Sequence, residues 1–270
     1  MTLKLTDQSL LRPEAYVGGK WLSAMSDAAI AVTNPANGAV IASVPILSAE
    51  QIESAIATAQ SVRADWAARP AKERSALLRK WYDLIVENAD DLAQILTAEQ
   101  GKPLAEAKGE ILSNAAFLEW FGEEAKRVYG EVIPATAQDR RVIVLKQPVG
   151  VCIAITPWNF PNGMITRKAG PALAAGCPII VKPASQTPLS AIALAVLADR
   201  AGIPAGVFQV VTGKARTIGE IFCKSPDVAK ISFTGSTEVG RWLIRESADD
   251  IKRLSLELGG ECALYRIRRR

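Results

Sequence analysis

Two loops of the sequence carry side chains of the kinds that bind or activate a polar ligand. The segment Thr156–Pro161 follows an apolar stretch and holds Asn159, whose amide is suited to donate to a developing oxyanion. Lys182 follows a second apolar stretch, where an ammonium group suits ribose hydroxyls or a phosphate. The alternatives are a simple turn residue for Asn159 and a solvated charge for Lys182.

A third loop, Phe233–Gly240, has the pattern of a strand that ends near Gly235 and a helix that begins at Ser236 or Thr237. A helix N-terminus presents free N–H groups and the positive end of its dipole, which favours an anion. The glycine triplet of the usual dinucleotide motif is absent, so an ordinary strand–helix turn with a Ser or Thr cap remains an alternative.

The elements that would position these loops alternate between short apolar strands and helices from residue 140 onwards. Such alternation is typical of βαβ units with a parallel sheet, so the predicted fold class is α/β, a Rossmann-like open parallel sheet with flanking helices. The three loops would then end three successive strands and converge. The predicted strands are 141–147, 150–156, 178–182, 207–211, 229–234 and 252–257, and the helices between them 162–175, 188–201, 215–223 and 237–248.

The first part of the chain predicts a hairpin at Tyr16–Trp21, a turn at Asn34–Gly38 before a strand, and then a helical region. Ser48 and Gln51 have the spacing of a capping box at the start of the first long helix. Further helices are expected at 70–88, 89–100 and 103–128, with Pro70 and Pro103 in first-turn positions and Gly101 as a helix terminator.

Composition excludes several classes of function. The chain has no histidine, which removes histidine-dependent triads and His-ligated metal centres, and we expect no metal site. The four cysteines form no Cys-x-x-Cys pair and are expected to be free, mostly buried thiols of a reducing compartment. No apolar run is long enough for a membrane span and no secretory leader is visible, so we expect a cytoplasmic protein. The net charge of +4 shows no basic face for nucleic acid, although the Arg-rich end leaves binding of RNA or an anionic membrane as a weaker alternative.

Together with Glu257, which ends a fourth predicted strand, these loops resemble those of the aldehyde dehydrogenase superfamily. The resemblance covers residues 10–260 and is most specific at Pro157–Pro161, Lys182–Pro188, Phe233–Gly240 and Leu256–Gly260. Within the superfamily the chain is most similar to the NADP-using bacterial succinate-semialdehyde dehydrogenases. The segments that carry this similarity are 34–38, 99–107 and 164–171.

The resemblance implies a division of catalytic labour that needs no histidine. In the family a cysteine thiolate attacks the aldehyde, an Asn side chain holds the oxyanion, hydride passes to the nicotinamide, and a Glu activates the water that hydrolyses the thioester. The matching residues here are Asn159 and Glu257.

The resemblance also implies a site for NADP, with NAD less expected. The cofactor would lie across Ile155–Trp158, with Lys182 on the adenosine ribose and Gly235 beside the pyrophosphate. Ser185 stands where NAD-preferring relatives commonly place Glu, whose carboxylate would repel a 2′-phosphate by roughly 4 kcal/mol at an effective dielectric constant of about 20. The full set of expected cofactor-binding residues is Ile155, Thr156, Pro157, Trp158, Lys182, Ser185, Phe233, Thr234, Gly235, Ser236, Val239 and Leu258.

Arg167 is the expected substrate residue, since in the resembled enzymes the matching Arg helps to hold the far carboxylate of a small semialdehyde. An Arg that caps a helix turn is the alternative. Glutarate semialdehyde is a second candidate substrate, and a non-catalytic NADP-binding fragment is a candidate of another class. The resemblance also implies a small-molecule semialdehyde as the partner, and full-length relatives are homo-oligomeric.

The chain departs from the family pattern after Gly260. The family nucleophile lies some thirty residues further on, and Cys262 does not match it in context. Permitted codons for residues 261–270, read one base later, give Asn-Ala-Pro-Phe-Ile-Val-Phe-Asp-Asp, the family continuation, so we interpret these residues as an out-of-frame tail and expect the chain alone to be inactive. The expected division is 1–131 (N-terminal strands and helical part of the cofactor domain), 132–149 (partial oligomerisation arm), 150–256 (Rossmann-like NAD(P)-binding domain), 257–260 (start of the catalytic domain) and 261–270 (tail).

Overall fold

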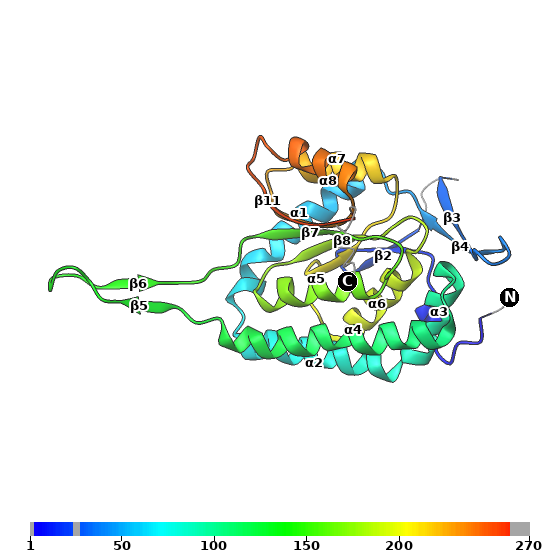
Figure 1. Ribbon diagram of the computed structural model, residues 1–270, viewed down its shortest axis with the longest axis horizontal. Helices are drawn as coiled ribbons and strands as arrows, with labels where there is room; N and C mark the ends of the chain where they lie inside the picture. Colours follow the sequence, from blue (N-terminus) through cyan, green and yellow to red (C-terminus); the bar gives the residue numbers. More distant parts are fainter. Residues whose placement is uncertain (1–2, 24–27, 260–270) are drawn as a thin grey trace, which may run out of the picture.

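A seven-stranded sheet forms the centre of the computed structural model, which describes residues 3–23 and 28–259. The strand order is β11-β10-β7-β8-β9-β1-β2 (Figure 1). The five strands from β7 to β11 are mutually parallel, while β1 and β2 add an antiparallel hairpin beside β9. The predicted α/β class is therefore confirmed. The strands are β1 Ala15–Val17, β2 Lys20–Leu22, β7 Val151–Ile155, β8 Ile179–Lys182, β9 Phe208–Val210, β10 Val228–Ser236 and β11 Arg253–Gly259.

Helices cover both faces of the sheet. One face carries α1, α7 and α8, and the other carries α5 and α6, with α2, α3 and α4 packed outside them (Figure 1). The strand residues alternate accordingly: Val151 and Ile153 join the core under α1 and α7, whereas Cys152 and Ala154 join the core under α5 and α6. The helices are α1 Ala49–Ala68, α2 Ala71–Glu87, α3 Ala89–Gln100, α4 Leu104–Glu124, α5 Gly163–Ala174, α6 Leu189–Ala201, α7 Ala215–Lys224 and α8 Thr237–Glu246, with short 3₁₀ turns η1 Gln8–Leu10 and η2 Ala125–Arg127.

Most predicted helix and strand boundaries lie within two residues of the observed ones. The capping box of Ser48 and Gln51 is present, and Gly101 ends α3 with a φ of 92°, a left-handed conformation that favours glycine. Pro70 and Pro103 are the N-cap residues rather than the first helical residues, because their ψ angles of 142° and 144° are extended. The helix expected to reach residue 128 ends at Glu124 and continues as the 3₁₀ turn η2.

The helices α5 and α6 begin without a side-chain cap of their own and are capped from elsewhere in the chain. Glu99 of α3 accepts hydrogen bonds from the backbone N–H groups of Leu189 and Ser190 at 2.7 and 2.8 Å. Glu110 of α4 accepts bonds from the N–H groups of Asn162 and Gly163, both at 3.1 Å. Burial raises the pKa of the Glu99 carboxyl to about 7, while its bonds to Ser190 and Leu189 act in the opposite direction. The two carboxylates therefore fix where the helices after β7 and β8 begin.

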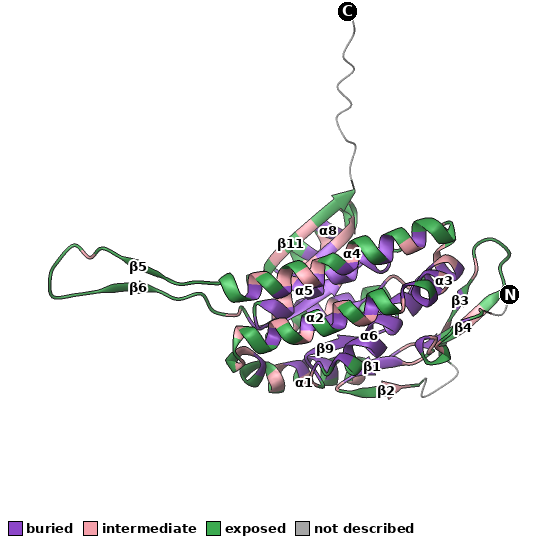
Figure 2. Ribbon diagram, turned by 90° about the horizontal axis from the view of Figure 1, so that it is seen from below, coloured by how far each residue is buried: buried purple, intermediate pink, exposed green. Residues whose placement is uncertain are grey.

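Two further hairpins extend from the body. One consists of β3 Ala29–Thr33 and β4 Val40–Pro45, and the other of β5 Glu131–Ile133 and β6 Val142–Val144. The second hairpin projects as a long arm and is exposed along its length, including 75% of Val132 and 62% of Ile143 (Figures 1 and 2). The predicted strand 141–147 is thus shorter, at 142–144. Two predictions lie outside the described residues. They are the tail at 261–270, which contains Cys262, and Gly260 at the end of the predicted catalytic-domain start.

Candidate active site

The strand order places a topological switch point between β7 and β10. The chain proceeds from β7 to β8 and β9 in one direction and then returns to place β10 and β11 on the other side of β7. In open α/β sheets such a switch point, at the carboxyl ends of the strands, is where ligands bind. The loops after Ile155 and Gly235 flank this point. The predicted convergence is confirmed, with one correction: β9 intervenes along the chain, so the strands that meet are neighbours in space rather than successive in sequence.

Several polar side chains along this edge are buried and have no hydrogen-bond partner within the described part of the chain. Buried polar groups in folded proteins are nearly always hydrogen-bonded. A set of unsatisfied groups at one edge therefore suits a polar ligand with hydroxyl or phosphate groups. Their atoms are Thr156 Oγ1, Thr187 Oγ1, Thr234 Oγ1 and both amide atoms of Asn162.

Lys182, at the end of β8, lies at the same edge and is 4% exposed. Burial lowers the pKa of its ammonium group to about 8. Among the described residues neither a carboxylate nor a hydroxyl forms a hydrogen bond or ion pair with its Nζ atom. A buried cation without a protein partner is costly, and an anionic or hydroxyl-rich ligand would relieve that cost. The donors at this edge therefore fit a dinucleotide.

Two hydrogen bonds hold the N-terminus of α8 in place next to β11. The hydroxyl of Ser236 accepts a hydrogen bond from the N–H of Val239 at 3.3 Å, and Thr237 donates to the carbonyl of Gly259 at 2.6 Å. A Cβ atom on Gly240 would lie 2.5 Å from Leu258, and one on Gly235 would lie 2.4 Å from the ring of Phe233. A side chain at either position would therefore require Leu258 or Phe233 to move.

The other residues predicted to bind a cofactor lie on the strand ends, loops and helix start at the carboxyl edge of the sheet. Trp158 is 54% exposed, Val239 and Leu258 are each 41% exposed, and Ser185 is half-buried in the loop after β8. Ile155 and Pro157 are half-buried on either side of the buried Thr156, and Phe233 is buried. Their roles toward a cofactor remain predictions.

Asn159 lies on the exposed loop between β7 and α5, and its backbone is tied down by Lys102. The Lys102 ammonium donates to the carbonyl of Asn159 at 3.0 Å and to Glu110 at 2.6 Å, and it lies 4.1 Å from the centre of the Phe160 ring. Since Glu110 also caps α5, one buried ion pair connects α4, the loop and the next helix.

The sequence analysis did not identify Lys102 and Glu110 as the residues that position the Asn159 loop and the start of α5. A signal was present for Glu110, because it lies on the same helical face as the buried Ala107, Ile111 and Leu118 of α4. A carboxylate within an apolar stripe is rarely buried unless it is paired.

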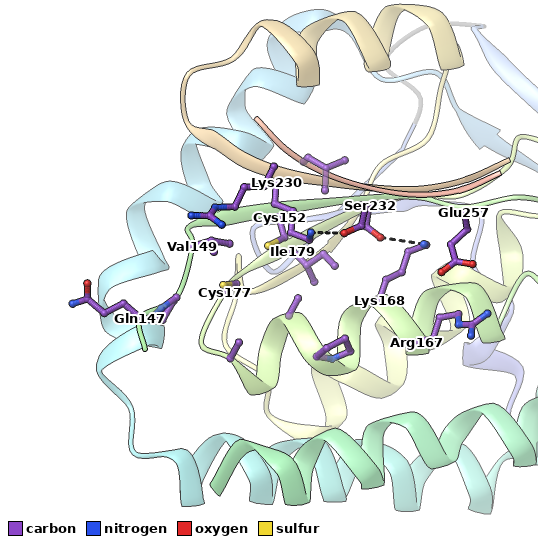
Figure 3. A pocket seen from close by; sticks show the side chains of 17 residues that line it. Gln147, Val149, Cys152, Arg167, Lys168, Cys177, Ile179, Lys230, Ser232 and Glu257 are labelled. Atoms are coloured by element: carbon purple, nitrogen blue, oxygen red, sulfur yellow. Dashed lines mark hydrogen bonds between the residues drawn. The ribbon is translucent and has the colours of Figure 1, made fainter. Parts of the chain in front are cut away.

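Glu257 lies in β11 opposite Thr234 and is exposed at the carboxyl edge. It lines a cavity of about 440 Å³ with Arg167 and Lys168 of α5 (Figure 3). Lys168 donates to the hydroxyl of Ser232 at 3.1 Å. Burial lowers the pKa of Lys168 to about 8, and the negative charge of Glu257 opposes that change.

Arg167 is exposed on the middle turns of α5, where its guanidinium lies 5.3 Å from the centre of the Phe117 ring. It therefore does not cap a helix end, and its side chain reaches the same cavity as Glu257. Its role toward a substrate carboxylate stays a prediction.

The described cysteines are free and buried, as predicted, but none lies at the carboxyl edge. Cys152 is at the beginning of β7, Cys177 immediately precedes β8, and Cys223 is in α7. Residues 3–23 and 28–259 also contain no group of three or more His, Cys, Asp or Glu side chains placed to hold a metal ion. No helix within these ranges is long and apolar enough to cross a lipid bilayer.

The family model described as "Aldehyde dehydrogenase family" matches residues 21–265. The chain is 59% identical over 258 residues to a glutarate-semialdehyde dehydrogenase of Pseudomonas aeruginosa, with 96% of this chain and 53% of the relative covered. It is 58% identical over 258 residues to the NADP(+) succinate-semialdehyde dehydrogenase of Escherichia coli, with 96% and 54% covered. The chain thus spans about half the length of these relatives.

Solved structures give the same result. The crystal structure of an aldehyde dehydrogenase from Brucella melitensis biovar abortus superimposes with a TM-score of 0.95 at 60% sequence identity, and the match covers 96% of this chain and 54% of the other.

We predict that Lys102→Met destabilises the chain by about 3 kcal/mol, because it leaves the Glu110 carboxylate buried without its cation. Urea unfolding measures the effect. Lys108→Met is the matched control: Lys108 is on α4, the helix of Glu110, and pairs with Asp90, but both side chains are well exposed. Its loss should cost no more than about 0.5 kcal/mol. Equal effects of the two substitutions would contradict the role of the buried pair.

We predict that Lys182→Met stabilises the ligand-free chain by roughly 1–3 kcal/mol at pH 7. The folded-state pKa of about 8 is below the ordinary value of 10.5, so the charged amine destabilises the fold below pH 8 and not above about 10.5. The gain should therefore shrink as the pH rises from 8 toward 10.5. Urea unfolding at several pH values tests this, with the exposed Lys72→Met as a control expected to be neutral. A gain that did not vary with pH would contradict it.

Proposed function

The chain belongs to the aldehyde dehydrogenase family, and from that premise we propose that it provides the cofactor-binding part of an NADP-dependent dehydrogenase that oxidises succinate semialdehyde to succinate. The observation that carries the proposal is the switch point between β7 and β10, because at this edge of the sheet Asn159 follows β7, Lys182 ends β8 and Glu257 lies near the end of β11. Identities of 58–59% to semialdehyde dehydrogenases support the substrate class.

Asn159 and Glu257 have complementary roles in this proposal. The amide of Asn159 donates to the aldehyde oxygen as it becomes an oxyanion, and Lys102 keeps the loop in place by bonding its backbone rather than its side chain. The exposed carboxylate of Glu257 takes a proton from the water that releases the acid product. Bound NADP supplies the acceptor for the hydride.

NADP binding is supported by Lys182, Ser185 and the N-terminus of α8. No described carboxylate or hydroxyl pairs with the buried Lys182, and α8 begins directly after β10, where the positive end of its dipole favours an anion. The hydroxyl of Ser185 leaves room for a 2′-phosphate that a carboxylate would repel. The named cofactor of the E. coli relative is also NADP.

The semialdehyde carboxylate would be recognised by Arg167. The cavity around it is rich in cations, since Lys168, Lys230 and Arg253 also line it and Glu257 is the one carboxylate that the described residues contribute to its lining. Glutarate semialdehyde is the second candidate, because two relatives at 58–59% identity are named for it and the same guanidinium suits either dicarboxylic semialdehyde.

The arm of β5 and β6 lies largely within residues 132–149, the range expected to form a partial oligomerisation arm. We propose that it pairs with another copy of the protein. Exposed Val132, Ile143 and Leu145 provide the apolar surface that such pairing would bury. In the same proposal, 1–131 and 150–256 form the cofactor domain and 257–260 begins the catalytic one.

We propose further that residues 1–270 bind NADP but do not oxidise an aldehyde by themselves. The described thiols lie away from the carboxyl edge, at the opposite ends of β7 and β8 and in α7. A purely NADP-binding role is the remaining alternative for the chain alone.

The direct test is titration of the purified chain with NADP, followed by an assay for NADPH formation with succinate and glutarate semialdehydes. We expect saturable binding, its loss in Lys182→Met, and no turnover. Absence of binding in the wild-type chain would refute the cofactor site. Turnover would refute the proposed lack of a nucleophile and would identify the substrate by its kcat/KM.

Cofactor choice is tested by Ser185→Glu. We expect the affinity for NADP to fall by at least about a hundredfold, because a carboxylate would face the 2′-phosphate, while NAD binding is retained or improved. Ser185→Ala is the matched control and should retain the preference for NADP. Equal affinities for both cofactors in the Glu variant would show that position 185 does not set the choice.

A further inference from the structure

One face of β10 and β11 carries a ladder of polar side chains. The two strands pair in register, so each polar residue of β10 lies beside a polar residue of β11. The residues between them point to the opposite face and join the apolar core under α7 and α8. Parallel strands are usually covered by apolar contacts on both faces, so a polar face on two of them is unusual. The polar pairs are Lys230 with Arg253, Ser232 with Ser255, and Thr234 with Glu257.

This polar face forms one wall of the cavity of about 440 Å³, and α5 forms the other wall (Figure 3). It is the same cavity that Arg167 and Glu257 line near the carboxyl ends of the strands. Lys230 and Arg253 lie toward the amino ends. Their Cα atoms are about 13 Å from those of the last pair, since a strand rises roughly 3.3 Å per residue.

The cavity contains more positive than negative charge. Four cations line it, and within the described part of the chain none of them forms an ion pair with a carboxylate. Lys230 and Arg253 also lie directly beside each other on adjacent strands, an arrangement of like charges that destabilises a sheet. An anion bound between them would remove that repulsion. The four cations are Arg167, Lys168, Lys230 and Arg253.

Two of these cations converge on one pair of serine hydroxyls. Lys168 Nζ donates to Ser232 Oγ at 3.1 Å, and Lys230 Nζ donates to Ser255 Oγ at 2.6 Å. The two serines are register partners on adjacent strands, so the four polar groups lie close together (Figure 3). A hydroxyl that accepts from an ammonium group keeps its own hydrogen to donate, and each ammonium group keeps two further N–H donors. The cluster therefore offers donors to a ligand that can only accept.

We propose that the half of the cavity toward the amino ends of β10 and β11 binds a phosphate group, either as inorganic phosphate or as a small phosphomonoester. The donors come from both walls of the cavity and do not lie in one plane. A tetrahedral anion suits such a set, whereas a carboxylate offers only two oxygens in one plane. The binding side chains are Lys168, Lys230, Ser232, Arg253 and Ser255.

This phosphate site is distinct from the predicted cofactor site, although it shares its cavity with Arg167 and Glu257. None of the residues expected to bind NADP lines the cavity. Lys182, for example, ends β8, two strands away from β10 in the sheet. Phosphate binding therefore depends neither on NADP nor on the proposed dehydrogenase activity.

The test is a calorimetric titration of the nucleotide-free chain with sodium phosphate in a chloride buffer at pH 7. The cavity variant combines Lys230→Gln with Arg253→Gln. Its matched control combines Lys224→Gln with Arg241→Gln, which removes the same charge from exposed positions outside the cavity. We expect saturable binding by the wild-type chain and the control, and at least about hundredfold weaker binding by the cavity variant, because each lost charge-assisted bond costs about tenfold or more.

A second variant separates a built site from general attraction of anions. Ser232→Ala combined with Ser255→Ala leaves every charge in place but removes both hydroxyl donors. We expect this variant to bind phosphate about tenfold more weakly, and the wild-type chain to bind acetate at least about tenfold more weakly than phosphate. A titration with glycerol 1-phosphate distinguishes the two sources, since tighter binding than that of inorganic phosphate identifies a phosphomonoester and weaker binding identifies the free ion.

Urea unfolding provides an independent readout. Phosphate should raise the unfolding midpoint of the wild-type chain but not that of the cavity variant, whose cooperative transition also shows that it is folded. NADP affinity should be the same in both. The proposal is overturned by the absence of saturable phosphate binding in the wild-type chain, by equal losses in the cavity variant and its control, or by unchanged affinity in the serine variant. A parallel loss of NADP binding would overturn it too, because the cations would then serve the cofactor.

Discussion

The interactions on which the rest of the structure depends are the two long-range carboxylate caps on α5 and α6. Glu110 and Glu99 reach from α4 and α3 to helix N-termini that have no cap of their own. Because each cap sets where its helix begins, it also sets the length and path of the loop before it, which carries Asn159 in one case and Lys182 in the other. The outer helices are therefore part of the site although they contribute no reacting group.

The buried, unpaired polar groups at the carboxyl edge of the sheet lower the stability of the ligand-free chain. The hydroxyls of Thr156 and Thr234 are buried without hydrogen-bond partners in the described part of the chain, whereas the same strands satisfy their backbone groups in regular ladders. Groups left unsatisfied in this way are pre-organised for a ligand, because no protein contact has to break when it binds. The two caps supply the rigidity that keeps these groups from collapsing onto one another.

Local signals in the sequence predicted the elements, and long-range contacts explain what was missed. The spacing of Ser48 and Gln51 predicts the start of a helix, and the apolar runs between helical patterns predict the parallel strands. The partners of Glu99 and Glu110, by contrast, lie 90 and 52 residues further along the chain. No periodicity in the sequence reports such a contact.

The antiparallel hairpin of β1 and β2 carries a consequence for biosynthesis. It joins the sheet only through β9, and Tyr16 bonds to Asp199 across 183 residues of sequence. At roughly 5–20 residues per second, a ribosome needs on the order of ten seconds or more to produce the partner. The hairpin therefore remains outside the exit tunnel with its apolar side exposed until β9 has been made. The first segment to be synthesised is thus among the last to pack into the fold.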